Sequence, residues 1–157
     1  SYPEWNGNCI YSEVIIPKQN NEMIQYFVNS APWPIKGRDV VLKTVENVKL
    51  ENIKEDLNEN VIIEIDIEAV NENLVSIKKD YIRINYLKGK WIIRGLKNNK
   101  SEIIYQISTD LAGAIPLSIS NLTSEEIPYK TILGIKKMIK KEKYIKKSVE
   151  YKEKLKK

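Results

Sequence analysis

The sequence predicts an α+β fold, in which an antiparallel sheet of about six strands is followed by a long C-terminal helix. Short runs of alternating or β-branched residues follow one another between turns as far as residue 109, which indicates an antiparallel meander. The composition then changes at Gly113 and Pro116. Beyond them isoleucines recur at helical spacing, which is typical of a helix with one apolar face.

The strands are predicted from periodicity and from the turn residues between them. Pro17 and the polar residues 18–21 end the first strand, and Gly89 marks a hairpin. The clearest strand covers residues 61–69, where Val or Ile alternates with Glu or Asp. We expect strands at residues 9–16, 22–30, 38–47, 61–69, 81–86, 90–94 and 101–109.

The helical region is expected to start near residue 117. Thr123 and Ser124 suit an N-cap, and Pro128 suits the first turn of a helix. The apolar stripe consists of Ile132, Ile135 and Ile139, with flanking positions at Leu133, Met138, Ile145 and Val149. This stripe is predicted to pack on the sheet or to form one wall of a cavity.

A stiff loop, Ala31–Asp39, connects the second and third predicted strands. Because side chains alternate along a strand, Arg38 is predicted to share an apolar face with Val40, Leu42 and Thr44. A cation on such a face needs a partner. The preceding strand offers Glu22, which shares a face with Ile24, Tyr26 and Val28. We therefore expect a Glu22–Arg38 ion pair in an apolar concavity; the alternative is a surface salt bridge between Arg38 and Asp39 or another acid.

The tip of this loop carries Trp33 and Ile35. These side chains either fold back over the core or form an apolar tip that gates a pocket or touches a membrane.

Several classes of chemistry are disfavoured by composition. The chain has no histidine and one cysteine, Cys9, which argues against Ser-His or Cys-His nucleophiles, disulfides and most zinc sites. Glu64, Asp66 and Glu68 line one strand face at a spacing of roughly 7 Å, too wide for one metal ion. No run of 18 apolar residues is present. We expect no enzymatic activity, no metal and no cofactor.

Basic residues are concentrated at the C-terminus. Residues 136–157 contain eleven lysines and three glutamates, while the whole chain carries a net charge of +5. This segment is either a solvated helix end or a surface that contacts anionic membranes in passing. It has no arginine, and only Tyr144 and Tyr151 could stack on bases, so nucleic-acid binding is disfavoured.

Four blocks of sequence resemble the START lipid-transfer domain family, and its bacterial members most closely. They occur in the family's order and at compatible spacing between residue 2 and about residue 140. The blocks are Tyr2-Pro3-Glu4-Trp5-Asn6; Trp33-Pro34-Ile35 with Arg38-Asp39-Val40; Tyr81-Ile82-Arg83-Ile84 with Gly89-Lys90-Trp91; and Gly113-Ala114-Ile115-Pro116 leading to Asn121.

The resemblance implies a helix-grip fold, in which a curved antiparallel sheet wraps a long C-terminal helix around a lipid-sized tunnel. It also implies an acid–arginine pair in the tunnel, whose arginine matches Arg38 and whose acid is best matched by Glu22. The expected function is binding, and intermembrane transfer, of one lipid or sterol-like ligand. The predicted lining residues are Glu22, Ile24, Tyr26, Trp33, Ile35, Arg38, Val40, Leu42, Ile63, Ile65, Tyr105, Ile132, Ile135 and Ile139.

The same resemblance sets the expected domain limits. Residues 1–147 would form the START-like domain and residues 148–157 a lysine-rich tail. A full domain of the family begins with a helix and further strands before the Tyr-Pro-Glu-Trp block, so we expect this chain to be a fragment of a longer protein.

Two other functions stay open at this point. The first is an enzyme of the polyketide cyclase or aromatase type, in which Arg38 and tyrosines would position a polyketone in the same cavity. The second is a scaffold module that acts through its basic tail.

Overall fold

The computed structural model describes residues 2–50, 61–70, 73–98, 100–113, 115 and 122–155 of the 157-residue chain. The chain divides into two compact units. Residues 10–115 form the first, which contains almost all of the sheet. The second combines residues 1–9 with residues 116–157, and it contains the C-terminal helices.

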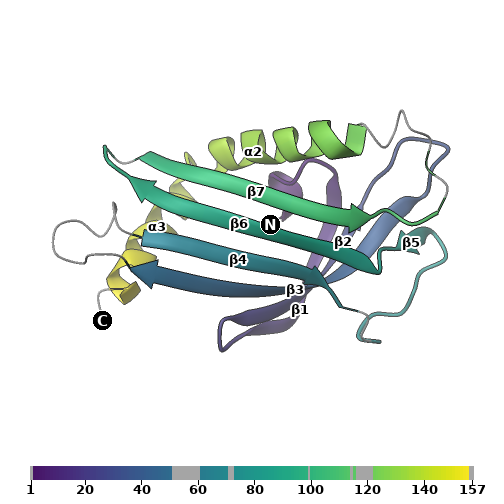
Figure 1. The fold of residues 1–157 in the computed structure, drawn as a ribbon, viewed down its shortest axis with the longest axis horizontal. Coiled ribbons are helices and arrows are strands. Elements are labelled where there is room, and N and C mark those ends of the chain that lie inside the picture. The colour runs from purple at the N-terminus through teal and green to yellow at the C-terminus, as the bar shows by residue number, and fades with distance from the viewer. Residues whose placement is uncertain are drawn as a thin grey trace. The chain divides into compact units, whose positions relative to one another are not determined.

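The first unit is built on a seven-stranded sheet with neighbours in the order β1-β2-β3-β4-β6-β7. The pairs β2–β3, β3–β4, β4–β6 and β6–β7 are all antiparallel, which confirms the predicted meander. Figure 1 shows β3, β4, β6 and β7 side by side. The strands are β1 (Cys9–Gln19), β2 (Glu22–Asn29), β3 (Gly37–Leu50), β4 (Val61–Ala69), β5 (Tyr81–Arg83), β6 (Tyr86–Leu96) and β7 (Lys100–Asp110).

The strand predictions hold best where alternation is strict. β4 has the predicted bounds, whereas β1 continues to Gln19 through Pro17. Proline lacks a backbone N–H donor and cannot bond to a neighbouring strand at that position. An outer strand has a neighbour on one side only, so the missing donor can face the side without a neighbour. β1 is the first strand in the described sheet order, so Pro17 is tolerated there.

The predicted hairpin at Lys88–Gly89 is wrong. β6 passes straight through Gly89, which lies opposite Ile67 of β4 and Ile107 of β7. A Cβ on Gly89 would lie 3.1 Å from the Gln106 carbonyl oxygen, so this glycine serves close strand packing rather than a turn. Residues 81–83 instead form the short strand β5, which pairs parallel with β3.

The second unit contains the helices. They are η1 (Tyr2–Glu4), the π-helical turn η2 (Leu122–Glu126), α2 (Ile127–Met138) and α3 (Glu142–Leu155). Pro128 lies in the first turn of α2 as predicted, whereas α2 begins after the predicted N-cap at Thr123 and Ser124. The predicted helical residues 117–121 lie outside the described residues.

The long C-terminal helix is two helices rather than one. The amide of Lys140 bonds to the Lys137 carbonyl and that of Lys141 to Met138, so the last turn of α2 closes with tighter i→i−3 bonds before α3 begins. The predicted domain boundary between residues 147 and 148 falls inside α3. Among the described helices, none combines the length and apolar character needed to cross a bilayer.

Contacts inside the second unit hold the N-terminal segment to the helices. The Glu4 carboxylate pairs with Lys141 at 2.8 Å and with Lys143 at 3.1 Å. The amide of Gly7 donates to the Thr131 hydroxyl at 3.2 Å. Gly134 lies so close to Trp5 that a Cβ would overlap the Trp5 backbone. The segment before β1 is therefore an integral part of this unit.

We expect Gly134→Ala to destabilise the protein by about 1–3 kcal/mol, because the added methyl group forces the Trp5 backbone away from α2. Urea unfolding monitored by far-UV circular dichroism measures this. Leu133→Ala, at a solvent-exposed neighbour, is the matched control and should change stability by about 0.5 kcal/mol or less. Equal stability of Gly134→Ala and the wild type would contradict the packing described here.

Candidate functional site

The two faces of the sheet differ sharply in chemistry. Residues directly opposite each other in an antiparallel ladder point to the same face, so the register assigns every side chain. One face, called here the apolar face, carries the apolar residues Phe27, Val40, Leu42, Ile63, Ile65, Ile67, Leu87, Trp91, Ile93, Ile103, Tyr105 and Ile107, together with Arg38 and the polar residues Gln25, Asn29, Thr44 and Glu46. It brings together six predicted lining residues: Arg38, Val40, Leu42, Ile63, Ile65 and Tyr105.

Burial is uneven along the apolar face. Phe27 and Val40 are fully buried, whereas Leu42, Ile63 and Ile65 keep part of their surface accessible. A set of aliphatic side chains that is half covered can still bury area against a hydrophobic molecule.

An aromatic pair lies on β6 and β7, about halfway along these two strands. The rings of Trp91 and Tyr105 are stacked, with centroids 3.9 Å apart and planes 13° apart. Burial raises the pKa of Tyr105 to about 12. Its hydroxyl therefore stays protonated at neutral pH and adds a polar atom to a surface that is otherwise largely aliphatic.

Arg38 is the buried cation of the apolar face and is only 6% exposed. Its Nε donates to the Leu111 carbonyl at 3.1 Å, one terminal nitrogen to the Ala112 carbonyl at 3.1 Å, and the other to the Lys36 carbonyl at 2.5 Å. Burial lowers the pKa of Arg38, but the group stays protonated at neutral pH. Arg38 thus anchors the chain after β7 to the start of β3.

The predicted Glu22–Arg38 ion pair is wrong. The Glu22 carboxylate is paired with Lys43 at 3.1 Å. In the β2–β3 register Glu22 lies opposite Val45, so its side chain points to the face away from Arg38. The surface alternative is wrong as well, because Arg38 is buried and bonded to carbonyl groups.

Ile24 and Tyr26 share this opposite face, so the register separates them from the other predicted lining residues. They belong to a hydrophobic cluster with Val28 and Val41. Tyr26 is only 1% exposed, which identifies it as a core residue.

The buried acid–arginine pair of the described structure is Asp39 with Arg83. Asp39 is fully buried, and its two oxygens accept bonds from Arg83 at 3.0 and 2.8 Å. The Tyr26 hydroxyl adds a third bond, at 2.9 Å. Hydrogen bonding to Asp39 raises the pKa of Arg83, while burial and the bond to Asp39 raise the pKa of Tyr26. Arg83 therefore stays protonated and charged at neutral pH, and Tyr26 stays protonated and neutral.

Arg83 extends the network to a neighbouring loop. Its guanidinium also donates to the carbonyl groups of Val75 and, at 3.5 Å, Ser76. The sequence carries a signal for this arrangement, since Asp39 follows Arg38 on a strand and must face the other way. Arg83 likewise lies between two isoleucines, Ile82 and Ile84.

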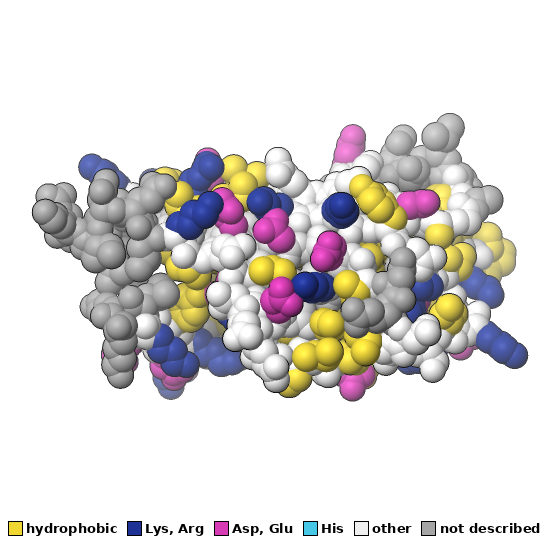
Figure 2. All heavy atoms as spheres, turned by 60° about the horizontal axis from the view of Figure 1, so that its bottom comes forward, with side chains coloured by type: hydrophobic (Ala, Val, Ile, Leu, Met, Phe, Trp, Pro, Cys, Tyr) yellow, Lys and Arg dark blue, Asp and Glu magenta, His cyan; other side chains and the backbone are white. Residues whose placement is uncertain are grey.

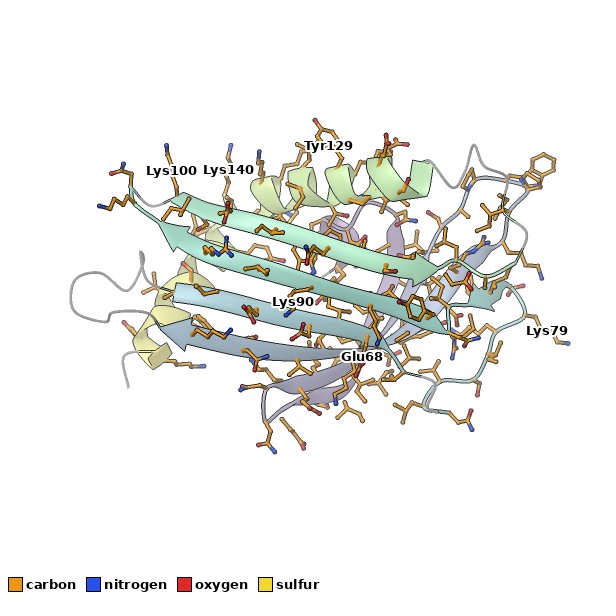
Figure 3. The ribbon with its side chains drawn as sticks, viewed as in Figure 1. Glu68, Lys79, Lys90, Lys100, Tyr129 and Lys140 are labelled. Atoms are coloured by element: carbon orange, nitrogen blue, oxygen red, sulfur yellow. The ribbon has the colours of Figure 1, made fainter. Side chains whose placement is uncertain are left out.

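The opposite face becomes charged beyond this cluster. Lys90 pairs with Asp66 at 3.1 Å, and Figure 3 shows Lys90 and Glu68 on adjacent strands. Arg94 pairs with Glu102 at 2.8 Å. In Figure 2 acidic and basic side chains lie next to one another, as such pairs require. Within the described ranges, no three acidic or cysteine side chains are arranged to hold a metal ion.

The remaining predicted residues are not part of the strand register. Trp33 is 92% exposed, and its peptide bond to Pro34 is cis, while Ile35 is half-buried in the same loop. Ile132 and Ile135 are half-buried on α2 in the second unit, but Ile139 follows the end of that helix and is 61% exposed.

The match to known families covers nearly the whole chain, since residues 1–148 match the START domain. The chain belongs to the START domain family. An uncharacterized protein of Pseudomonas aeruginosa is 26% identical over 143 residues, which are 88% of this chain and 63% of that protein. The chain therefore spans less than two thirds of this relative's length.

Solved structures agree on the fold. The STAR-related lipid transfer protein fragment of Xanthomonas axonopodis superimposes with a TM-score of 0.72 at 24% identity, covering 89% of this chain and 72% of that one. Human STARD10 gives 0.72 at 20% identity, with 94% and 56% covered. Human StAR-related lipid transfer protein 5 gives 0.69 at 18% identity, with 87% and 62% covered. The predicted α+β helix-grip fold is confirmed, and with family membership it supports binding of a hydrophobic ligand.

We expect Asp39→Asn to cost about 3–5 kcal/mol of stability, because it leaves the Arg83 guanidinium without its counter-charge inside the protein. Urea denaturation measures the difference. Glu102→Gln, which breaks the half-exposed pair with Arg94, is the matched control and should cost about 1 kcal/mol or less. If both substitutions had the same small effect, the buried network would not have the role given to it here.

Proposed function

We propose that the protein binds one hydrophobic ligand of lipid or sterol size against the apolar face of its sheet. The observation that carries this proposal is the set of part-exposed aliphatic side chains that β3, β4, β6 and β7 bring to one face, where Thr44 and Glu46 are the polar residues of β3 and Glu46 is paired with Lys18. A ligand that is polar throughout, such as a sugar, would find few matching partners on such a surface. An acyl chain or a sterol ring system would be favoured by roughly 25 cal/mol per Å² of apolar area buried.

Two groups are proposed to orient the polar end of the ligand. A guanidinium has five N–H donors, and Arg38 uses three of them on carbonyl groups. The Tyr105 hydroxyl is the second group, and it remains protonated at neutral pH. The proposed lining residues of the sheet are Arg38, Val40, Leu42, Ile63, Ile65 and Tyr105.

Transfer of the ligand between membranes is the second part of the proposal. Solved relatives of the same fold are named lipid transfer proteins. A carrier needs a site that exchanges its cargo, and a surface dominated by hydrophobic contacts meets this need without any bond being made or broken.

We propose that the protein acts without catalysis. A cyclase or aromatase needs a group that exchanges protons near neutral pH. Among the proposed lining residues the candidate would be Tyr105, and its pKa of about 12 makes it a weak acid. Arg38 is held by three carbonyl groups and stays protonated, so it can position an oxygen but cannot act as a base.

We expect Ile65→Trp to lower the fraction of purified protein that carries a bound lipid, because the indole occupies the space that the ligand would fill beside Trp91. Native mass spectrometry measures the occupied fraction, and organic extraction identifies the ligand. The loss should be about tenfold if filling the site costs 1–2 kcal/mol of binding.

The matched control is Gln106→Trp, which adds an indole at an exposed position on the opposite face of β7. Its lipid occupancy should equal that of the wild type. A wild-type protein that stays empty after incubation with phospholipids, fatty acids and sterols would refute the proposed function.

A further inference from the structure

Arg38 is a buried cation that has no carboxylate partner in the described part of the chain. It is 6% exposed, and its bonds go to the carbonyl groups of Lys36, Leu111 and Ala112. A guanidinium inside a protein is costly unless an opposite charge replaces the water that it loses. Carbonyl groups supply dipoles but no net charge. The described residues therefore leave one positive charge on the apolar face without a counter-charge.

Arg83 shows how the protein neutralises a second, largely buried arginine close by. Two of its nitrogens donate to the Asp39 carboxylate, at 3.0 and 2.8 Å. This hydrogen bonding raises the pKa of Arg83, whereas burial lowers the pKa of Arg38. In the parallel β3–β5 pairing Arg83 lies opposite Asp39, the residue that follows Arg38. The two arginines are therefore near neighbours along the sheet, but the described structure gives a carboxylate to Arg83 alone.

Two acids that lie close to Arg38 in the chain or beside its carbonyl partners are bonded to other groups. Asp39 points to the opposite face, where Arg83 bonds to both of its oxygens. Asp110 comes just before the carbonyl groups that hold Arg38, and its Oδ1 accepts a bond from the Ala112 amide at 2.9 Å. Neither acid forms an ion pair with Arg38 in the described structure.

One further acid shares the apolar face with Arg38. Among β2, β3, β4, β6 and β7 the register brings a single acidic side chain, Glu46, to this face. At a rise of about 3.3 Å per residue, Glu46 lies roughly 26 Å along β3 from Arg38. It is also paired with Lys18 at 2.8 Å. A negative charge for Arg38 therefore has to come from outside the described residues.

The backbone around the Arg38 guanidinium is held in a tight turn. Ala112 has a φ of 52° and Gly113 has a φ of 74°, in the left-handed region that residues with a side chain rarely adopt. The bond from the Ala112 amide to Asp110 closes this turn, and the carbonyl groups of Leu111 and Ala112 accept bonds from Arg38. Unusual backbone conformations of this kind cluster at ligand-binding sites. The guanidinium is therefore fixed in position by its surroundings.

Two N–H donors of Arg38 remain without a described partner, one on each terminal nitrogen. Each terminal nitrogen of a guanidinium carries two N–H groups, and in Arg38 each uses one of them on a carbonyl group. The terminal nitrogens of a planar guanidinium can bind both oxygens of one carboxylate, and such charge-assisted bonds are stronger than bonds to a neutral acceptor. A hydroxyl or an ester could accept the same bonds but would leave the charge of Arg38 in place.

We propose that the ligand of the apolar face is a lipid carboxylic acid, whose ionised carboxylate pairs with Arg38 and whose hydrocarbon chain lies on the aliphatic side chains of the sheet. This assignment rests on the proposed function and adds the charge of the ligand to it. The single negative charge of a carboxylate matches the single positive charge of Arg38. A phosphate monoester carries about −1.5 to −2 charges at neutral pH, so part of its charge would be buried without a partner.

The test is native mass spectrometry of the delipidated wild-type protein with equal amounts of four ligands. These are palmitate, methyl palmitate, cholesterol and a lysophosphatidic acid with the same palmitoyl chain. We expect palmitate to bind about tenfold more tightly than methyl palmitate, because the ester has the same chain but cannot form the charge-assisted bonds. Cholesterol and the lysophosphatidic acid are also expected to bind more weakly than palmitate.

The outcomes separate this assignment from the proposed function. Methyl palmitate, cholesterol or the lysophosphatidic acid binding as tightly as palmitate would overturn the assignment, while binding of a hydrophobic ligand would stand. Binding of none of the four would also overturn the assignment. The proposed function fails with it only if phospholipids leave the protein empty as well.

A variant locates the charge that selects the ligand. Arg38→Gln keeps a side-chain donor but removes the charge, so we expect its affinity for palmitate to fall about tenfold and its affinity for methyl palmitate to stay nearly unchanged. Arg94→Gln is the matched control, because it removes an arginine that is paired with Glu102 on the opposite face. Its affinities for both ligands should equal those of the wild type.

An equal loss of palmitate and methyl palmitate binding in Arg38→Gln would show that Arg38 only supports the structure, and it would overturn the assignment. Circular dichroism shows whether this variant folds, since Arg38 also anchors the chain after β7. If the variant is unfolded, the comparison of the four ligands on the wild-type protein decides the assignment by itself.

Discussion

The arrangement at the start of β3 depends on one constraint, which is that adjacent residues of a strand point to opposite faces. Arg38 and Asp39 are both buried, and alternation sends them in opposite directions. Each charge is then satisfied in a different way. Asp39 is bonded by Arg83 and Tyr26, whereas Arg38 is bonded by backbone carbonyl groups.

This division gives the two charges different roles. The Asp39–Arg83 pair closes the cluster around Tyr26 and holds the loop at residues 73–80, which is a structural task. Arg38 remains on the apolar face and fixes the backbone after β7. A buried cation whose described partners are all carbonyl groups keeps donors for a polar group of a ligand, whereas a neutralised ion pair would offer less. The loop that carries Trp33 ends where β3 begins at Gly37, directly before Arg38, so this loop joins the sheet beside the apolar face.

Much of the sheet and of its apolar face could be predicted from the alternation of residues along single strands. The strict alternation of β4 identified its bounds and its faces, and the same reasoning placed Arg38 correctly with Val40 and Leu42. The error over Glu22 has a different origin. Alternation fixes which residues of one strand share a face, but the pairing register between strands decides which faces coincide, and a shift of one residue reverses the answer.

The other differences between the predictions and the structure arise from contacts with residues distant in the sequence, which a local pattern does not contain. Gly89 was predicted as a turn, yet it lies in mid-strand, where its missing side chain allows close approach of β7. Ile77 is 73% exposed in a loop whose Val75 carbonyl accepts a bond from Arg83, a contact that no local sequence pattern signals. The division of the C-terminal helix at residues 139–141 likewise follows from bonds that no periodicity signals.

The central claim is that a hydrophobic ligand contacts the face of the sheet that carries Arg38, and isoleucine methyl NMR tests it most directly. Ile63 and Ile65 lie on that face, while Ile92 and Ile104 lie on the other face of the same four-stranded region. Titration with the ligand identified by extraction should shift the methyl signals of Ile63 and Ile65 and leave those of Ile92 and Ile104 nearly unchanged. Shifts confined to Ile92 and Ile104 would contradict the account.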